Sequence, residues 1–186
     1  MSDVAIVLAA GGSRRLGRPK QLVRIDGESL VERAVRVALE AGLIVAVVVG
    51  DTIDAGGTGA TVLVNDAWEE GMGTSVACGV AWAAGTGART ATILTCDQYM
   101  ITGEDLRSLR ESRESVDAEV AAALYDDVLG VPATFASRCF ERLVQLGGDR
   151  GARELLRDGS LNAVAVPMPH AARDVDEVAD LEEFGA

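Results

Sequence analysis

Short, continuous runs of apolar residues recur along the chain and alternate with stretches of helical periodicity. Most of these runs lack the apolar–polar alternation of a half-exposed strand, so we expect strands that are buried on both faces of a sheet. The predicted strands are residues 4–8, 44–49, 61–64, 90–95, 119–124 and 163–166. Their alternation with helices predicts a single-domain α/β fold with a mainly parallel, doubly wound sheet.

Helical patterns fill the gaps between the predicted strands. Ser29 and Glu32 form a capping-box pattern ahead of an apolar stripe that ends at Gly42, and Thr102 with the acids after it opens another helix. The other predicted helices are residues 74–84, 134–146, 152–156 and 178–184. The stretch 124–135 differs, because a turn at 125–127 would let residues 128–131 return antiparallel.

Composition narrows the class of protein. The 186 residues, 48% of them hydrophobic, suffice for one substantial core, and we expect one domain over residues 1–186. A formal net charge of −12 disfavours nucleic acid and anionic membranes as partners. The three cysteines lack C-x-x-C spacing, and the first apolar run is too short for a membrane span and has no basic flank. These features predict a cytoplasmic location.

The loop after the first predicted strand reverses the charge of the rest of the chain. It holds the only lysine, Lys20, and no acidic residue occurs between positions 4 and 25. Gly11 and Gly12 let the backbone approach phosphate oxygens, and Arg15 and Lys20 would neutralise their charge. The alternative is a basic surface turn. The spacings of the P-loop and of the dinucleotide fingerprint are both absent, which disfavours an NAD-dependent dehydrogenase.

Acidic residues follow two other predicted elements. Asp97 comes directly after the strand at 90–95, and the carboxyl ends of parallel strands share one edge of a sheet. Asp97 is therefore placed to hold Mg²⁺ beside a phosphate, unless it only caps a helix. Asp174 or Asp176 could add a second carboxylate, although Asp176 could also simply favour a helix N-terminus. The polar segment 65–75 offers small hydroxyls and amides to a base or ribose.

Taken together, these segments resemble the molybdenum-cofactor nucleotidyltransferase family, and within it the cytidylyltransferase branch. Residues 8–22 are similar to the family's signature loop, in which Ala10 resembles the CTP-using members. Residues 65–75, 96–98, 146–153 and 174–176 resemble its later motifs. Three departures lie mainly on the acceptor side: Tyr99 where the family usually has proline, Val131 before Pro132, and Glu177-Val178 where the terminal motif often continues Thr-Pro.

The resemblance implies a nucleotide-diphospho-sugar-transferase-like fold and a cytoplasmic enzyme. It would move CMP from CTP, rather than GTP, to a phosphorylated acceptor, the molybdopterin form of molybdenum cofactor, and release pyrophosphate. It would use Mg²⁺, or alternatively Mn²⁺, and could contact a molybdoenzyme or its maturation chaperone. The implied catalytic residues are Arg15, Lys20 and Asp97; the nucleotide-binding residues are Leu8, Ala9, Ala10, Gly11, Gly12, Ser13, Asn65 and Ser75; and the metal ligands are Asp97, Asp174 and Asp176.

Two other functions stay open at this point. A cytidylyltransferase of the same fold could act on a sugar phosphate or a polyol phosphate. A catalytically silent protein that binds the nucleotide or the cofactor is the other alternative, because Tyr99 and Val131 replace the family's usual residues.

Overall fold

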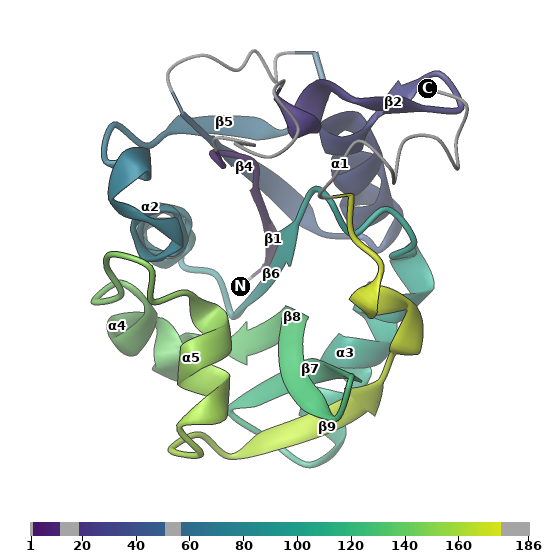
Figure 1. The fold of residues 1–186 in the computed structure, drawn as a ribbon. Coiled ribbons are helices and arrows are strands. Elements are labelled where there is room, and N and C mark those ends of the chain that lie inside the picture. Colours follow the sequence, from purple (N-terminus) through teal and green to yellow (C-terminus); the bar gives the residue numbers. More distant parts are fainter. Residues whose placement is uncertain (1, 12–18, 51–56, 176–186) are drawn as a thin grey trace.

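A seven-stranded sheet organises the computed structural model, which describes residues 2–11, 19–50 and 57–175 (Figure 1). The strands of this sheet are β1 (Asp3–Leu8), β4 (Ile44–Val49), β5 (Thr61–Val64), β6 (Thr90–Thr95), β7 (Val120–Tyr125), β8 (Val128–Ala136) and β9 (Ala163–Pro167). A separate two-stranded hairpin comprises β2 (Arg24–Ile25) and β3 (Glu28–Ser29). The α-helices are α1 (Leu30–Glu40), α2 (Met72–Gly85), α3 (Gly103–Ser115), α4 (Phe140–Leu143) and α5 (Ala152–Arg157). The 3₁₀ turns are η1 (Lys20–Leu22), η2 (Trp68–Glu70), η3 (Ser137–Cys139) and η4 (Pro169–Ala172).

The order of the strands creates a switch point beside β1. The sheet runs β5-β4-β1-β6-β8-β7-β9, so the chain moves from β1 to β4 and β5 on one side and then returns to β6 on the other. β1, β4, β5 and β6 are parallel to one another. In such sheets ligands bind beyond the carboxyl ends of the strands where the winding direction changes. The segments after β1 and β6 therefore flank the expected binding region.

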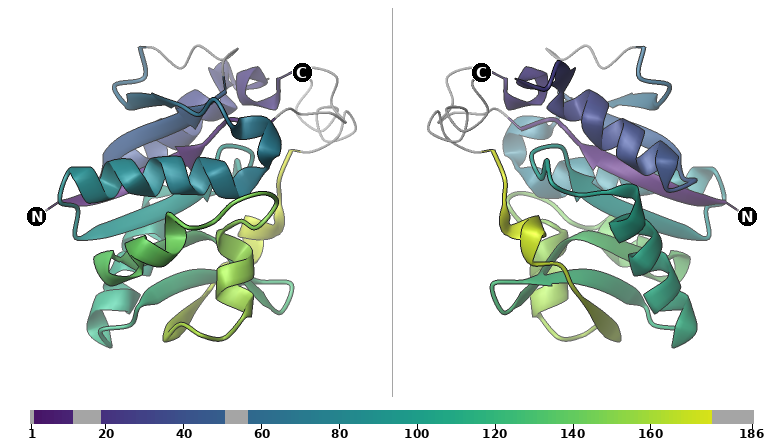
Figure 2. Two further views of the ribbon diagram at one scale, coloured as in Figure 1. Left: turned by 90° about the vertical axis from the view of Figure 1, so that its left-hand side faces the viewer. Right: turned by 90° about the vertical axis from the view of Figure 1, so that its right-hand side faces the viewer.

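Both faces of the sheet are covered by helices, as the continuous apolar runs predict. Along β1, Val4 and Ile6 belong to the core under α2, whereas Ala5 and Val7 belong to the core under α1 and α3. Figure 2 shows α2, α4 and α5 on one side and α1 and α3 on the other. Gly79 lets α2 approach closely, because a Cβ there would lie 2.3 Å from a side-chain carbon of Ile6. The prediction of strands buried on both faces is confirmed for β1, β4, β6 and β7. It is wrong for β5 and β9, which are largely exposed because they form the two edges of the sheet.

Two helix starts follow the predicted capping chemistry. At α1 the Ser29 hydroxyl accepts a hydrogen bond from the Glu32 N–H, and the Glu32 carboxylate accepts one from the Ser29 N–H. Thr102 and Asp105 make the same reciprocal pair at the start of α3. Such caps satisfy backbone donors that a helix leaves unpaired. None of the helices in the described parts of the chain has the length and apolar character that crossing a membrane requires.

The predicted helix at 134–146 is wrong in its first part. Residues up to Ala136 belong to β8, which runs antiparallel to both β6 and β7, and only Phe140–Leu143 forms α4. Phe135 is fully buried in this strand, and the hydroxyl groups of Thr92 and Thr134 share a hydrogen bond of 2.8 Å across the β6–β8 pair. Pairing with two neighbours fixes the strand, and local helical periodicity could not reveal that.

Candidate active site

An ion pair joins the segment after β1 to the end of β6. Lys20 begins the 3₁₀ turn η1, and its Nζ donates to Oδ2 of Asp97 over 2.5 Å. Asp97 is 8% exposed, and its other oxygen, Oδ1, is buried without a hydrogen-bond partner in the part of the chain that the structure describes. The two residues are 77 positions apart, so the sheet topology alone brings them together. The structure places a positive and a negative charge side by side at the switch point.

Gln21 holds the backbone that leads into the cationic loop. Its side chain is fully buried, and its amide nitrogen donates to the carbonyl oxygens of Ala9 (2.7 Å) and Gly11 (2.6 Å). These bonds tie η1 to the end of β1 and place Lys20 beside that end. Sequence reasoning missed Gln21, because bonds from a side chain to backbone carbonyls leave no residue-type signature.

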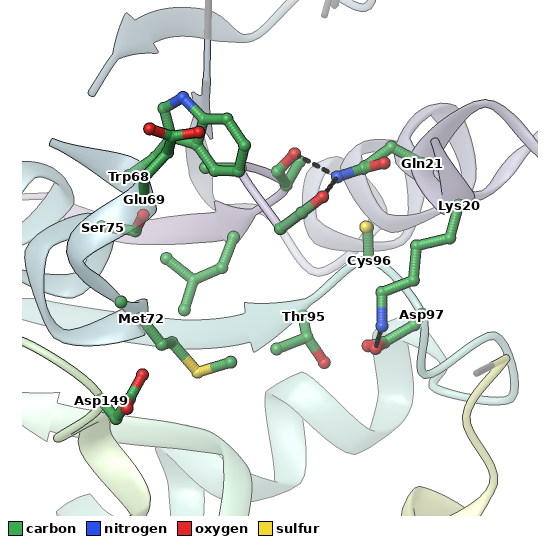
Figure 3. Close-up of a pocket in the computed structure, with 15 residues that line it drawn as sticks. Lys20, Gln21, Trp68, Glu69, Met72, Ser75, Thr95, Cys96, Asp97 and Asp149 are labelled. Carbon is green, nitrogen blue, oxygen red and sulfur yellow. Dashed lines mark hydrogen bonds and ion pairs between the residues drawn. The ribbon is translucent and has the colours of Figure 1, made fainter. Parts of the chain in front are cut away.

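A cavity of about 360 Å³ opens between the end of β1, η2 and the start of α2. Figure 3 shows Lys20 and Asp97 at one end, with Trp68 and Glu69 at the other. The indole of Trp68 lies close to Gly50, where a Cβ would come within 3.1 Å of the ring. Trp68 thus both packs and lines the cavity. Of the residues named from sequence, the cavity is lined by Leu8, Ala9, Ala10, Gly11, Lys20, Ser75 and Asp97.

Asn65 lies behind this cavity and supports its wall. The side-chain amide donates to the hydroxyls of Thr74 (2.9 Å) and Ser75 (3.0 Å), and its oxygen accepts from the Ala67 N–H. Asn65 is buried and is not among the lining residues. Its geometry therefore orients Ser75, which does line the cavity.

Two glycine-bearing segments pack so closely that side chains would not fit between them. A Cβ on Gly71 would lie 2.3 Å from the backbone of Gly148, and one on Gly73 would lie 2.5 Å from the carbonyl oxygen of Arg150. The Gly73 N–H also donates to the Gly148 carbonyl over 2.9 Å. This contact brings Asp149 to the cavity wall. The sequence alone presents residues 147–151 only as a sharp turn.

Replacing Gly73 with alanine should disturb the site through this contact. The new methyl group would meet backbone atoms, which cannot rotate away, and such overpacking costs about 1–3 kcal/mol. For a chain of this size we expect thermal denaturation roughly 2–10 °C below wild type. Gly85→Ala is the matched control on the same helix, because nothing lies within 4 Å of a Cβ there. Equal melting temperatures for the two variants would contradict the packing argument.

A second cavity, of about 390 Å³, adjoins the first. The two share five lining residues: Leu8, Lys20, Met72, Thr95 and Asp97. The new walls include Tyr125, whose hydroxyl donates to the Val131 carbonyl over 3.1 Å, and Arg153, whose guanidinium lies 5.9 Å from the centre of the Tyr125 ring. Burial raises the pKa of Tyr125, so its hydroxyl stays protonated as a donor. The Lys20–Asp97 pair thus lies where the two cavities meet.

A second carboxylate approaches this meeting point. The Val175 N–H donates to the Asp97 carbonyl over 3.2 Å, and Asp174 lines the second cavity with Asp97. Mg²⁺ is usually held by one or two carboxylates, with phosphate oxygens and water completing its shell. The unpartnered Oδ1 of Asp97 fits that role. The described residues contain no group of three or more His, Cys, Asp or Glu arranged for a metal.

Several predicted residues lie outside the described parts of the chain. These are Gly12, Ser13, Arg15 and Asp176, together with the predicted helix at 178–184. Their roles stay predictions. Beyond Gln21, the structure adds Trp68, Met72 and Asp149 to the first cavity, and Gln98, Tyr125 and Arg153 to the second.

Cys96 and Tyr99, close to Asp97 in the sequence, both pack into the core. Burial, and to a smaller extent the charge of Asp97, raises the pKa of the Cys96 thiol far above its ordinary value, so Cys96 stays a protonated core residue. Tyr99 packs against the small core of Val23, Ile25, Leu30 and Val175. Tyr99 thereby supports the segment that carries Asp174, a contact by which this chain accommodates its departure from the usual proline.

Comparisons with known proteins agree with this geometry. Residues 5–165 match the family model described as the MobA-like NTP transferase domain. The chain is similar to the purine catabolism protein PucB of Bacillus subtilis (strain 168), with 30% identity across 97% of this chain and 93% of that protein.

Solved structures show the same fold at lower identity. Rv0371c of Mycobacterium tuberculosis H37Rv superposes with a TM-score of 0.84, at 24% identity over 100% of this chain and 98% of that one. A structure of Rv0371c in complex with manganese has a TM-score of 0.75, at 22% identity over 100% and 99%. Molybdopterin-guanine dinucleotide biosynthesis protein A of Archaeoglobus fulgidus has a TM-score of 0.69, at 18% identity over 97% and 95%.

Proposed function

Because this chain belongs to the MobA-like family of molybdenum-cofactor nucleotidyltransferases, we propose that it moves CMP from CTP to the molybdopterin form of molybdenum cofactor. Nucleotidyl transfer follows from the family. The choice of CTP, of this acceptor and of Mg²⁺ is the proposal. Such a transfer requires both substrates to meet at one phosphorus atom. The geometry of the site supports such a meeting.

One observation carries the proposal: the Lys20–Asp97 pair lies at the junction of two cavities. A transferase for two substrates needs two adjoining pockets that meet at the reacting phosphorus. Their volumes, about 360 and 390 Å³, lie within the range of small-molecule sites. Holding two reactants in line at such a junction supplies much of the rate of phosphoryl chemistry.

We assign the first cavity to CTP, with its phosphates near Lys20. The ammonium would neutralise charge on the triphosphate and its developing transition state, as a compact point charge can. Gln21 keeps the Ala9–Gly11 backbone in place beside it. The base would then lie toward the wall that contains Ser75 and Met72, with the small Ala10 nearby. Ala10 is the residue on which the preference for CTP over GTP rests.

Asp97 and Asp174 would hold the divalent ion. When bound, Mg²⁺ supplies positive charge that phosphate oxygens share in the transition state. The buried, unpartnered Oδ1 of Asp97 and the proximity of Asp174 support this assignment. The manganese bound to the mycobacterial structure supports a divalent ion, with Mn²⁺ as the alternative to Mg²⁺.

The second cavity would receive the acceptor. Its phosphate oxygen forms a bond to the α-phosphorus of CTP while the bond from that phosphorus to the β-phosphate bridging oxygen breaks, which releases pyrophosphate. A phosphate nucleophile is already anionic, so no general base is needed. Arg153 in the cavity wall offers a guanidinium, the group best suited to a second anionic contact.

A thermal-shift screen of ATP, CTP, GTP and UTP with Mg²⁺ tests the nucleotide assignment. A ligand at about 100 times its Kd adds about 2.7 kcal/mol, which for this chain length is a rise of roughly 5–10 °C. We expect that rise for CTP and a clearly smaller one for GTP. An equal response to all four nucleotides, or a preference for GTP, would contradict the assignment of CTP.

Pyrophosphate release then tests the acceptor. With CTP and Mg²⁺, we expect release with the molybdopterin form of molybdenum cofactor and none with sugar phosphates or polyol phosphates. Release with one of those phosphates instead would replace the acceptor while keeping the reaction. Selective CTP binding without release from any acceptor would favour a catalytically silent binding protein.

A further inference from the structure

Gln98 makes hydrogen bonds that mirror those of Gln21 on the other side of the ion pair. It is 8% exposed, and its amide nitrogen donates to two backbone carbonyls, those of Val131 and Ala171, over 2.8 Å each. Its side-chain oxygen accepts from the Thr95 hydroxyl at 3.2 Å. Gln98 therefore connects the end of β6 to β8 and to η4.

The two carbonyls that Gln98 holds belong to the walls of the second cavity. Val131 and Ala171 both line it, as does Gln98 itself. Val131 acts here through its backbone oxygen, which also accepts from the Tyr125 hydroxyl. The aliphatic side chain at position 131, a departure from the family pattern, leaves this contact intact. The side chain of Gln98 therefore bridges β8 and η4 within the wall of this cavity.

Gln98 also follows Asp97 directly in the chain, and the two side chains serve different partners. Asp97 pairs with Lys20, whereas Gln98 binds the opposite walls. Ala171 precedes Asp174 by three residues, so a fixed η4 also fixes the approach of the second carboxylate. The wall of the second cavity is thus held from the residue next to Asp97.

We propose that Gln98 is a positioning residue that sets the acceptor cavity, as Gln21 does for the nucleotide cavity. This inference rests on the proposed function, because it assigns the second cavity to the acceptor. A buried amide facing two carbonyls is not replaceable by a group of equal size without donors, since both oxygens would lose that partner. Gln21 would thus orient the nucleotide cavity and Gln98 the acceptor cavity, on either side of the Lys20–Asp97 ion pair.

Gln98→Met tests the proposal, because methionine keeps the length of the side chain and removes both donated bonds. With the full chain, CTP, Mg²⁺ and the molybdopterin form of molybdenum cofactor, we expect the KM for the acceptor to rise about tenfold or more. The Kd for CTP, measured by calorimetry without acceptor, should change less than about twofold. Gln21→Met should show the reverse pattern. Gln145→Met, at an exposed glutamine outside both cavities, should leave both constants unchanged.

Hydrogen exchange provides a readout that needs no substrate. In Gln98→Met, the amides of residues 168–175 should exchange about tenfold faster or more, while those of residues 4–10 keep their wild-type rates. If Gln98→Met fails to fold, Gln98→Asn serves instead, because it keeps an amide but is one methylene too short to reach both carbonyls. It should show a smaller change in the same direction.

The outcomes distinguish the positioning role of Gln98 from the proposed function of the protein. Faster exchange with an unchanged KM for the acceptor would overturn the positioning role and leave the proposed function standing. Unchanged exchange would overturn the claim that Gln98 holds the walls. A wild-type protein that releases no pyrophosphate would overturn the proposed function and the acceptor assignment together, and the exchange experiment would still decide what Gln98 holds.

Discussion

Lys20→Ala should lower kcat/KM by about 10²–10³, the loss typical of removing one preorganised charge donor from a transition state. Lys20 is the only lysine of the chain, and its ammonium lies at the junction of both cavities. Lys20→Arg should recover only part of the rate, because a planar guanidinium cannot take the place of a compact ammonium. Steady-state kinetics of pyrophosphate release with CTP measures both effects.

Arg24→Ala is the matched control for Lys20. Arg24 lies four positions later, has a side chain that is 60% exposed, and lines neither cavity. Its removal takes the same charge from the same segment, so kcat/KM should stay near the wild-type value. Wild-type turnover by a folded Lys20→Ala protein would refute the assignment of the phosphates to this end of the cavity.

Asp97→Asn should abolish Mg²⁺-dependent turnover, with a loss of about 10³-fold or more. The substitution keeps the shape of the side chain and removes the charge that would hold the cation. The fold should survive, since asparagine can still accept a hydrogen bond from Lys20. Activity measured across a range of Mg²⁺ and Mn²⁺ concentrations, together with a melting temperature, separates loss of the metal from loss of structure.

Asp127→Asn is the matched control, because it removes the same charge from a carboxylate outside both cavities. Asp127 is exposed in the β7–β8 turn at a positive φ of 59°, which asparagine also adopts readily, and it lines neither cavity. We expect normal turnover and an unchanged requirement for the cation. Full activity of Asp97→Asn, or an equal loss in Asp127→Asn, would remove Asp97 from its proposed role.

The sequence predicted the fold most reliably where burial on both faces leaves a continuous apolar run. The strands around β1 and β6 followed from that pattern, and the rule for parallel sheets then placed Lys20 near Asp97. The strand pairing of β8 was predicted only as far as Val131, because residues 134–136 owe their conformation to two neighbouring strands rather than to local periodicity. Tertiary pairing overrode the local signal.

The parts of the site that sequence reasoning missed share a physical cause. Gln21 and Gln98 act on backbone carbonyls, and carbonyls are the same at every position of the chain. The close approach of Gly73 to Arg150 is possible because glycine has no Cβ, and the sequence pattern does not reveal such a contact. Charged residues beside predicted strands can be found from the sequence, whereas the amides and glycines that orient them are recognisable only from their contacts in the folded protein.

Because Lys20 is the only lysine, a lysine-directed acylating reagent can modify only this side chain. Its side chain is 19% exposed and faces the cavities, so lysine-directed acetylation would convert the ammonium to a neutral amide at the junction of both pockets. Coupling the protein to a resin through lysine would occupy the same position. Attachment through exposed carboxylates, such as those of Glu104 and Asp117, would leave that position unmodified.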